Sequence, residues 1–374
     1  MKIYADENMP LVQAFFQHLG EVVLFDGRKV TATELADADI LLVRSVTTVN
    51  ASLLDTNTKL RFVGTATIGT EHVDQAYLAS RNIAFASAPG CNAQSVVEYV
   101  LSSLWYLAEH YQWQLSDKTI GVVGVGNIGS LLVRCLTALG LKVLQCDPLR
   151  HEEAESNFFH TDFNSLCQQA DIISFHTPLT QEGKWPSRHL LNARSLARLK
   201  PDCAIINASR GGVIDNAALL DDLTAKAQRR AVVLDVWENE PDVLSALLPY
   251  VDIATAHIAG HSVEGKARGT QMLYQRCCEL LGQPVQWQLQ QLLAQPAMEK
   301  LQISANFGLP DVQNLARLLY DVRRDDAIFR HALSVKGFDW IRKTYPPRRE
   351  FSSLQLSGKV IPDYLLQLGF SLAQ

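Results

Sequence analysis

GVVGVGNIGSLLVRCLTALGLKVLQCDP, residues 121–148, is the stretch that decides the fold of this chain. An apolar run is followed by three glycines spaced G-x-G-x-x-G, then by a helical apolar pattern and a second apolar run that ends at an acid. Gly140, between the helical pattern and the second run, is a natural helix terminator. The order predicts a strand, a tight turn, a helix and a second parallel strand.

The three glycines suit a dinucleotide phosphate site. Gly124 permits the tight turn, Gly126 lets the backbone approach a pyrophosphate, and Gly129 lets the helix pack close to the strand. A helix N-terminus there offers N–H groups and partial positive charge to phosphates. Asp147, eighteen residues after the last glycine, suits the two hydroxyls of an adenosine ribose and would repel a 2′-phosphate. We therefore expect NAD rather than NADP, bound by Gly124, Gly126, Asn127, Ile128, Gly129 and Asp147.

Composition narrows the function classes. The chain has 374 residues, which predicts two or three domains, and a net charge of −5, which gives no basic surface for nucleic acid. No apolar run reaches the roughly 18–20 residues of a membrane span, and acids stand where a signal peptide needs an apolar stretch. Seven scattered cysteines without a CxxC pair suggest reduced thiols. We expect a cytoplasmic protein with no nucleic acid, membrane or metal partner.

Short apolar segments alternate with helical patterns over the first 282 residues, which indicates two parallel βα arrays. A long helix over about 92–111 joins them. From about residue 286 the chain becomes rich in glutamine, then mixes aromatic and basic residues, and is expected to form a small α+β domain for packing or dimerisation. Within it, Arg348 and Arg349 are expected to form a solvated charge pair.

Three polar residues follow strands of the second array. Arg210 comes after IINAS, Glu240 lies in LDVWENEP, and His257 ends DIATAH. Ligands bind at this end of the strands in open α/β sheets. The set suits hydride chemistry on a 2-hydroxy acid, because arginine can hold a carboxylate, histidine can take the hydroxyl proton, and glutamate can orient the histidine.

LKPDCAIINASRGGVIDNAALL, LDVWENEP and the strand before His257 resemble the D-isomer-specific 2-hydroxyacid dehydrogenase family over about residues 1–282. The resemblance implies two Rossmann-like parallel-sheet lobes. The first is a flavodoxin-like substrate lobe, residues 1–92 completed by 258–282, and the second is the NAD-binding lobe, residues 93–257. Further stretches, among them DENMP, VRSVT and GTATIGTEHVD, resemble one member of the family. That likeness implies a homodimer, with residues 286–374 as an α+β dimerisation domain, and a small phosphorylated 2-hydroxy acid as substrate.

The family's substrate-binding arginine and catalytic glutamate and histidine fall on Arg210, Glu240 and His257. Glu238 is an alternative partner for the histidine, but Glu240 has the family's position before proline. His176 also follows a strand and is taken as a pocket residue rather than the acid/base.

Other positions are implied by the same resemblance. Ser45 and Thr67 match substrate-contacting positions, and Arg44 either pairs with the substrate phosphate or fixes its own loop. His261 stands where related enzymes often carry tyrosine, and its imidazole can still donate to a phosphate or carboxylate. The remaining NAD-contacting positions are Thr177, Ala208, Asp235 and Gly260.

Two alternatives stay open at this point. One is another dehydrogenase of the family, acting on 3-phosphoglycerate or hydroxypyruvate. The other is a non-catalytic protein that senses NAD with the same fold. The C-terminal domain argues against the first, and the Arg210, Glu240 and His257 set argues against the second.

Overall fold

The computed structural model describes residues 1–153, 158–225 and 230–373, and these form two compact units. One unit comprises Met1–Asn92 and Ser262–Gln295, and the other comprises Ala93–His261 and Pro296–Gln374. This division differs from the expected one, because the C-terminal segment groups with the dinucleotide-binding residues instead of standing apart. None of the described helices is both long enough and apolar enough to span a membrane.

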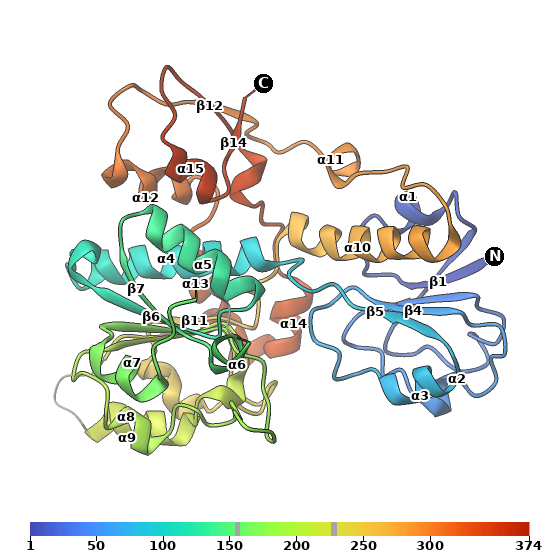
Figure 1. The fold of residues 1–374 in the computed structure, drawn as a ribbon, viewed down its shortest axis with the longest axis horizontal. Coiled ribbons are helices and arrows are strands. Elements are labelled where there is room, and N and C mark those ends of the chain that lie inside the picture. Colours follow the sequence, from blue (N-terminus) through green and yellow to red (C-terminus); the bar gives the residue numbers. More distant parts are fainter. Residues whose placement is uncertain (154–157, 226–229, 374) are drawn as a thin grey trace. The chain divides into compact units, whose positions relative to one another are not determined.

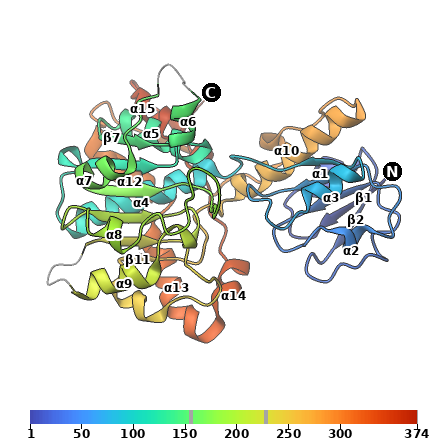
Figure 2. The same cartoon turned by 60° about the horizontal axis from the view of Figure 1, so that its bottom comes forward.

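The first unit is built on a five-stranded parallel sheet in the order β2-β1-β3-β4-β5. Helices α1 (Val12–Phe16) and α10 (Val263–Leu281) cover one face, and α2 (Ala51–Leu54) and α3 (Gln75–Ser80) cover the other (Figures 1 and 2). The short helix α11 (Leu289–Leu292) follows α10. The strands are β1 (Lys2–Asp6), β2 (Glu21–Phe25), β3 (Ile40–Val43), β4 (Phe62–Thr65) and β5 (Ala84–Ala86).

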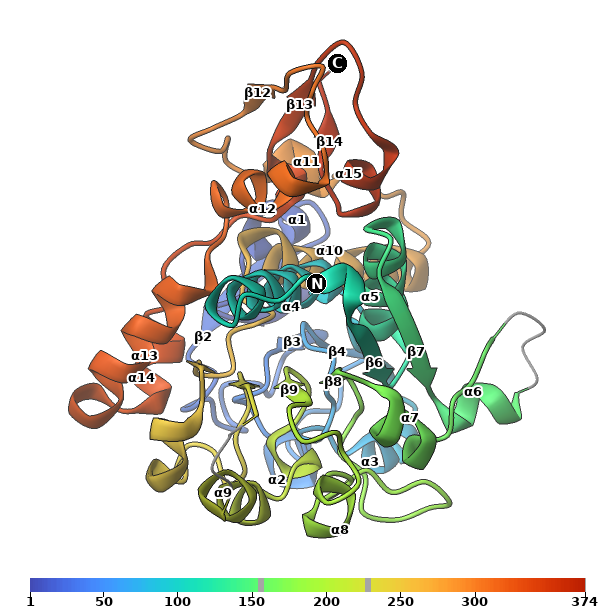
Figure 3. The ribbon, with the colours of Figure 1, turned by 90° about the vertical axis from the view of Figure 1, so that its left-hand side faces the viewer.

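The second unit contains a six-stranded parallel sheet in the order β11-β10-β9-β8-β6-β7. Its strands are β6 (Thr119–Val123), β7 (Lys142–Cys146), β8 (Ile172–Phe175), β9 (Ala204–Asn207), β10 (Val232–Leu234) and β11 (Ile253–Ala254). Helices α4 (Ala93–His110) and α5 (Asn127–Ala138) lie on one face (Figure 3). The other face carries α7 (Phe163–Gln169), α8 (Ala193–Leu196) and α9 (Asn216–Ala225). The short helix α6 (Pro148–Glu152) and the 3₁₀ turns η1 (Leu115–Asp117), η2 (Gly211–Val213) and η3 (Ser245–Tyr250) complete the connections.

The C-terminal segment is α+β, as expected. A three-stranded parallel sheet joins β12 (Lys300–Gln302), β13 (Gln355–Ser357) and β14 (Ser371–Leu372). Its helices are α12 (Leu309–Arg317), α13 (Val322–Lys336), α14 (Phe338–Lys343) and α15 (Asp363–Gln367), with the 3₁₀ turn η4 (Phe351–Ser353). Apolar residues of this segment and of α4 and α5 belong to one continuous core. The second unit therefore buries both faces of α4, which explains why thirteen of its eighteen residues are buried.

A buried polar cluster joins α4 to the C-terminal segment. Glu98 Oε1 accepts a hydrogen bond from the Phe351 N–H at 2.7 Å, and Ser95 Oγ donates to Glu350 at 2.8 Å. The Arg348 guanidinium is 3.9 Å from the Glu98 carboxylate. It is also buried, at 2% exposure, so the expectation that it is solvated was wrong. An arginine is stable there because its guanidinium packs on the face of the Tyr320 ring, 3.8 Å away, and donates a hydrogen bond to the Ser95 carbonyl.

Glu98 makes the stability of this unit depend on pH. Burial, together with the charge of Glu350, raises the pKa of Glu98 to about 8 from its usual 4.5. The folded state thus keeps a proton that the unfolded chain releases, so the contribution of Glu98 to stability is full below pH 4.5 and is lost as the pH rises through 8. For one group the slope is at most about 1.4 kcal/mol per pH unit.

We predict that Glu98→Gln, which stays neutral and keeps an oxygen for the Phe351 N–H, gains stability relative to the native chain as the pH rises from 5 to 8.5. Urea unfolding across that range measures the gap. Glu109→Gln on the same helix is the control, because a hydrogen bond from Arg317 lowers the pKa of that exposed carboxyl and its gap should stay constant over this range. A constant gap for Glu98→Gln as well would contradict the account.

Candidate active site

The glycine turn follows β6 and opens helix α5, as the sequence predicts. Gly124 has φ +85°, and a Cβ there would lie 2.7 Å from the backbone of His176. A Cβ at Gly129 would lie 2.0 Å from the carbonyl oxygen of Gly124, so the helix and the turn pack too closely for any side chain. A Cβ at Gly126 would meet nothing within 4 Å. The turn therefore leaves open space in front of the first residues of α5, Asn127 and Ile128.

Asp147 follows β7 and faces the same turn. Its Oδ2 accepts a hydrogen bond from the Val125 N–H at 2.8 Å, and its Oδ1 accepts from the Arg150 N–H at 3.2 Å, which caps α6. The Arg150 guanidinium in turn donates to the Val125 carbonyl and to Ser130 Oγ. Each carboxylate oxygen has a second lone pair, so Asp147 can still accept from ribose hydroxyls.

A dinucleotide fits the residues around the turn. Thr177 follows β8. Its hydroxyl oxygen is buried and has no hydrogen-bond partner among the described residues. A buried hydroxyl without a partner is costly unless a ligand satisfies it. The space at Gly126 leaves room for a pyrophosphate, the Asp147 carboxylate can accept hydrogen bonds from a ribose, and Ala208 after β9 is a buried apolar contact. Together with the Thr177 hydroxyl, these groups fit a bound NAD.

His257 and Glu240 form the central pair of the second unit. His257 Nδ1 and Glu240 Oε2 are 2.8 Å apart, and both side chains are partly exposed. An ionised carboxylate can only accept, so in the neutral imidazole that pairs with it Nδ1 carries the proton and Nε2 keeps a lone pair. His257 has φ +55°, an uncommon conformation for a residue other than glycine. A strained backbone of this kind persists only where neighbours hold it.

Asp235 and Trp237, which follow β10, hold that segment. The Asp235 carboxylate accepts from the Ile258 and Ala259 N–H groups at 2.7 and 2.9 Å, and its own carbonyl accepts from the His257 N–H. Burial raises the pKa of Asp235, whose side chain is 1% exposed. Asp235 thus supports the loop between His257 and Gly260, and its contact with NAD stays a prediction.

Trp237 connects this support to the carboxylate of the pair. Its backbone N–H donates to Glu240 Oε1 at 2.8 Å, and its indole N–H donates to the Thr255 carbonyl at 2.8 Å. Sequence reasoning did not single out Trp237. The available signal was its place inside LDVWENEP, between the strand and the glutamate.

Arg210 lies after β9, and the turn that follows it contacts the loop between β10 and Glu240. A Cβ at Gly211 would lie 1.8 Å from the carbonyl oxygen of Trp237, so the turn after Arg210 packs directly against the backbone that leads to Glu240. Glu238 does not face His257. Its Oε1 is 2.6 Å from His189 Nε2, which leaves Glu240 as the carboxylate beside His257.

His176 is not suited to acid/base work. It is buried, and its Nε2 is 2.9 Å from Ser174 Oγ. Burial lowers the pKa of His176 to about 3, so it stays neutral at physiological pH. Among the residues that the structure describes, no three His, Cys, Asp or Glu side chains come together as metal ligands.

The predicted substrate residues divide between the units. In the first unit, Ser45 lies in an exposed turn after β3, and the Arg44 guanidinium donates to the Asn8 carbonyl at 3.4 Å. Thr67 follows β4, and its hydroxyl donates to the Gly69 carbonyl at 2.8 Å. In the second unit, His261 lies just after Gly260, with its ring edge-on to Tyr345 at 5.8 Å.

Comparison with known proteins connects this geometry to a family. The model of the D-isomer specific 2-hydroxyacid dehydrogenase NAD-binding domain matches residues 92–259, and a domain of unknown function matches residues 292–369. The chain is 50% identical, over the full length of both proteins, to the erythronate-4-phosphate dehydrogenase of Pseudoalteromonas translucida. This chain belongs to the erythronate-4-phosphate dehydrogenase family. The Proteus mirabilis protein of that name is 51% identical over 95% of this chain and 94% of its own.

Solved structures agree on the fold. The D-lactate dehydrogenase of Aquifex aeolicus, complexed with NAD and lactic acid, superposes with a TM-score of 0.59 at 23% identity, covering 75% of this chain and 96% of its own. About a quarter of this chain thus has no counterpart there. Membership of the family makes the chain an NAD-dependent oxidoreductase that acts on the CH–OH group of a hydroxy acid, so the non-catalytic alternative falls away.

We predict that NAD is strongly preferred over NADP, because a 2′-phosphate would face the Asp147 carboxylate. Asp147→Asn removes this repulsion but keeps an oxygen for the Val125 N–H. The ratio of kcat/KM for NAD to that for NADP should fall by about tenfold or more, the effect of roughly 1.4 kcal/mol. Equal kcat/KM values for the two cofactors in the native enzyme would contradict the role given to Asp147.

Proposed function

We propose that the enzyme oxidises 4-phospho-D-erythronate at C2 with NAD, giving (R)-3-hydroxy-2-oxo-4-phosphooxybutanoate, a step of pyridoxal 5′-phosphate (vitamin B6) biosynthesis in the cytoplasm. The observation that carries the proposal is the His257–Glu240 pair, beside the Arg210 turn, in a chain 50% identical over its full length to proteins named for this substrate. All seven cysteines are buried thiols outside any disulfide, which agrees with a reducing compartment.

His257 is the proposed general base. Its Nε2 takes the proton of the C2 hydroxyl as the C2 hydrogen leaves with its electron pair, and the ring becomes positive. NAD, when bound, accepts that hydride. Glu240, 2.8 Å from Nδ1, fixes the ring and stabilises the charge that develops on it.

Arg210 is proposed to hold the substrate carboxylate. Its planar guanidinium can form two parallel hydrogen bonds to a carboxylate, which fixes the neighbouring C2. For the rest of the substrate we propose Ser45, Thr67 and Arg44 in the first unit and His261 in the second, with Arg44 and His261 as candidates for the phosphate. Arg44 and His261 are the two positions where the sequence leaves the contact open.

The test is steady-state NADH formation with a panel of 2-hydroxy acids. We predict that 4-phospho-D-erythronate gives the highest kcat/KM, ahead of unphosphorylated D-erythronate, 3-phospho-D-glycerate and D-glycerate. The phosphate and the chain length are the two features that the panel varies. An equal or higher kcat/KM for 3-phosphoglycerate would replace the proposed substrate with that of the alternative dehydrogenase.

Two histidine variants serve as controls for the mechanism. His257→Ala should lose about 10²- to 10⁴-fold in kcat, the usual contribution of a general base, while binding NAD normally. His176→Ala should keep far more activity, since its ring is buried and neutral. Near-native turnover in His257→Ala would assign the proton to another group.

We also propose a homodimer held by the C-terminal segment. Of the sixteen large apolar side chains that are exposed among the described residues, seven lie in the last 79 positions of the sequence. They are Leu309, Leu318, Val335, Trp340, Val360, Leu366 and Leu372. This enrichment in one segment supports the proposal, because apolar side chains that form a contiguous patch mark an interaction surface.

We predict that the full chain sediments at twice the 41.5 kDa of one copy. The single variants Leu318→Glu, Val335→Glu and Val360→Glu each place a charge on an exposed apolar position. A variant should weaken the dimer if the partner covers that position. Analytical ultracentrifugation over a range of protein concentrations measures the effect. A native chain that sediments as a monomer at micromolar concentration would contradict the proposal.

A further inference from the structure

Strand β11, which leads to His257, is the edge strand of the six-stranded sheet. It comprises only Ile253 and Ala254, and it pairs with β10 on one side alone. The N–H groups on its outer side would be left to water, and a strand this short gains little from its ladder. The position of His257 thus depends on what covers the outer side of β11.

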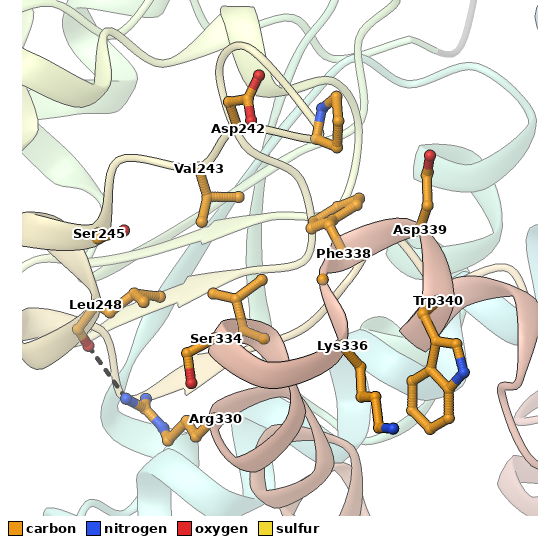
Figure 4. A pocket seen from close by; sticks show the side chains of 13 residues that line it. Asp242, Val243, Ser245, Leu248, Arg330, Ser334, Lys336, Phe338, Asp339 and Trp340 are labelled. Carbon is orange, nitrogen blue, oxygen red and sulfur yellow. Dashed lines mark hydrogen bonds between the residues drawn. The ribbon is translucent and has the colours of Figure 1, made fainter.

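Helix α13 of the C-terminal segment covers it. Asp326 Oδ1 accepts a hydrogen bond from the Ala254 N–H at 2.7 Å. Arg330, one turn further along, binds the same carboxylate at 2.9 Å and donates to the Val251 carbonyl at 2.6 Å. It also donates to the Leu248 carbonyl at 3.1 Å (Figure 4). Side chains of α13 therefore bind the Ala254 N–H within β11 and the carbonyls of Leu248 and Val251 before it.

The same helix also supports the glutamate of the pair. The Phe329 ring stacks on the Trp237 ring, with centroids 5.6 Å apart and planes 12° apart, and both side chains are at most 2% exposed. Trp237 is the residue whose two N–H groups bind Glu240 and Thr255. Phe329 thus supports both Glu240 and the strand that leads to His257 through one residue, Trp237.

We propose that α13 is a positioning element for the His257–Glu240 pair, with Phe329 and Asp326 as its positioning residues. The inference rests on the roles proposed for His257 and Glu240. It gives the C-terminal segment, which corresponds to the domain of unknown function, a part in catalysis in addition to dimerisation. The helix holds the imidazole and the carboxylate in line without touching substrate or cofactor.

A cavity lies between α13 and the loop that follows Glu240. Beyond the Arg330 contact, α13, α14 and residues 241–248 line a cavity of about 630 Å³ (Figure 4). Pro241, next to Glu240, is on its wall. The loop after Glu240 therefore borders a cavity, and the contacts of Phe329, Asp326 and Arg330 are the ones that join α13 to Trp237 and to the backbone around β11.

The test compares two buried, stacked phenylalanines of the same segment. Phe329→Leu removes the ring that packs on Trp237, and Phe351→Leu removes a ring that stacks on Phe370 at 4.7 Å. Both lose a similar core contact. We expect kcat of Phe329→Leu to fall by about tenfold to a hundredfold, the usual effect of misplaced reacting groups. Its dissociation constant for NAD should change far less than its kcat, because the glycine turn and Asp147, which are predicted to bind the pyrophosphate and the ribose, lie three or more strands away from β11. Phe351→Leu should keep its kcat.

Asp326 gives a second, milder pair of variants. Asp326→Ala removes the acceptor for the Ala254 N–H and should lower kcat, whereas Asp326→Asn keeps an acceptor oxygen and should restore most of it. Thermal unfolding of all four variants reports stability separately. Equal kcat in Phe329→Leu and Phe351→Leu, together with native kcat in Asp326→Ala, would overturn the inference. If His257→Ala keeps its turnover, the proposed catalytic role fails instead, whatever α13 does.

Discussion

The 2.8 Å contact between Glu240 and His257 is the interaction on which the proposed function depends. In the neutral imidazole it leaves Nε2 as the ring nitrogen with a free lone pair. The contact joins two loops that leave different strands, so neither residue can hold the other in place alone. His257 also has a strained backbone, which only its surroundings can maintain.

Three neighbours provide that support. Asp235 accepts hydrogen bonds from the backbone just after His257, and Trp237 donates to Glu240 and to the Thr255 carbonyl just before His257. Helix α13 covers the open edge of the sheet. The first two come from the loop that carries Glu240, whereas the third comes from the C-terminal segment, far along the chain. An edge strand of two residues holds the proposed catalytic side chain weakly, and we propose that α13 compensates for this.

Local patterns predicted much of this structure. The glycine spacing gave the turn, the helix and the acid at the next strand, because each depends on residues close in sequence. The Arg210, Glu240 and His257 set was recognisable because polar residues after buried strands meet at one edge of a parallel sheet. Long-range contacts were not accessible in this way. A run such as Arg348–Arg349 looks solvated until the fold places Glu98 and Tyr320 around the first guanidinium. The shared core of α4 and the C-terminal segment, and the stack of Phe329 on Trp237, also join residues far apart in sequence, so local patterns did not predict them.

The most direct test of the account is a crystal structure of the full chain with NADH and the 2-oxo acid product bound. The account predicts that the C2 oxygen lies within about 2.6–3.2 Å of His257 Nε2, with Nδ1 still on Glu240. It also predicts that the guanidinium of Arg210 contacts the carboxylate of the product. A C2 oxygen bound to another side chain, with His257 turned away from it, would contradict the central claim.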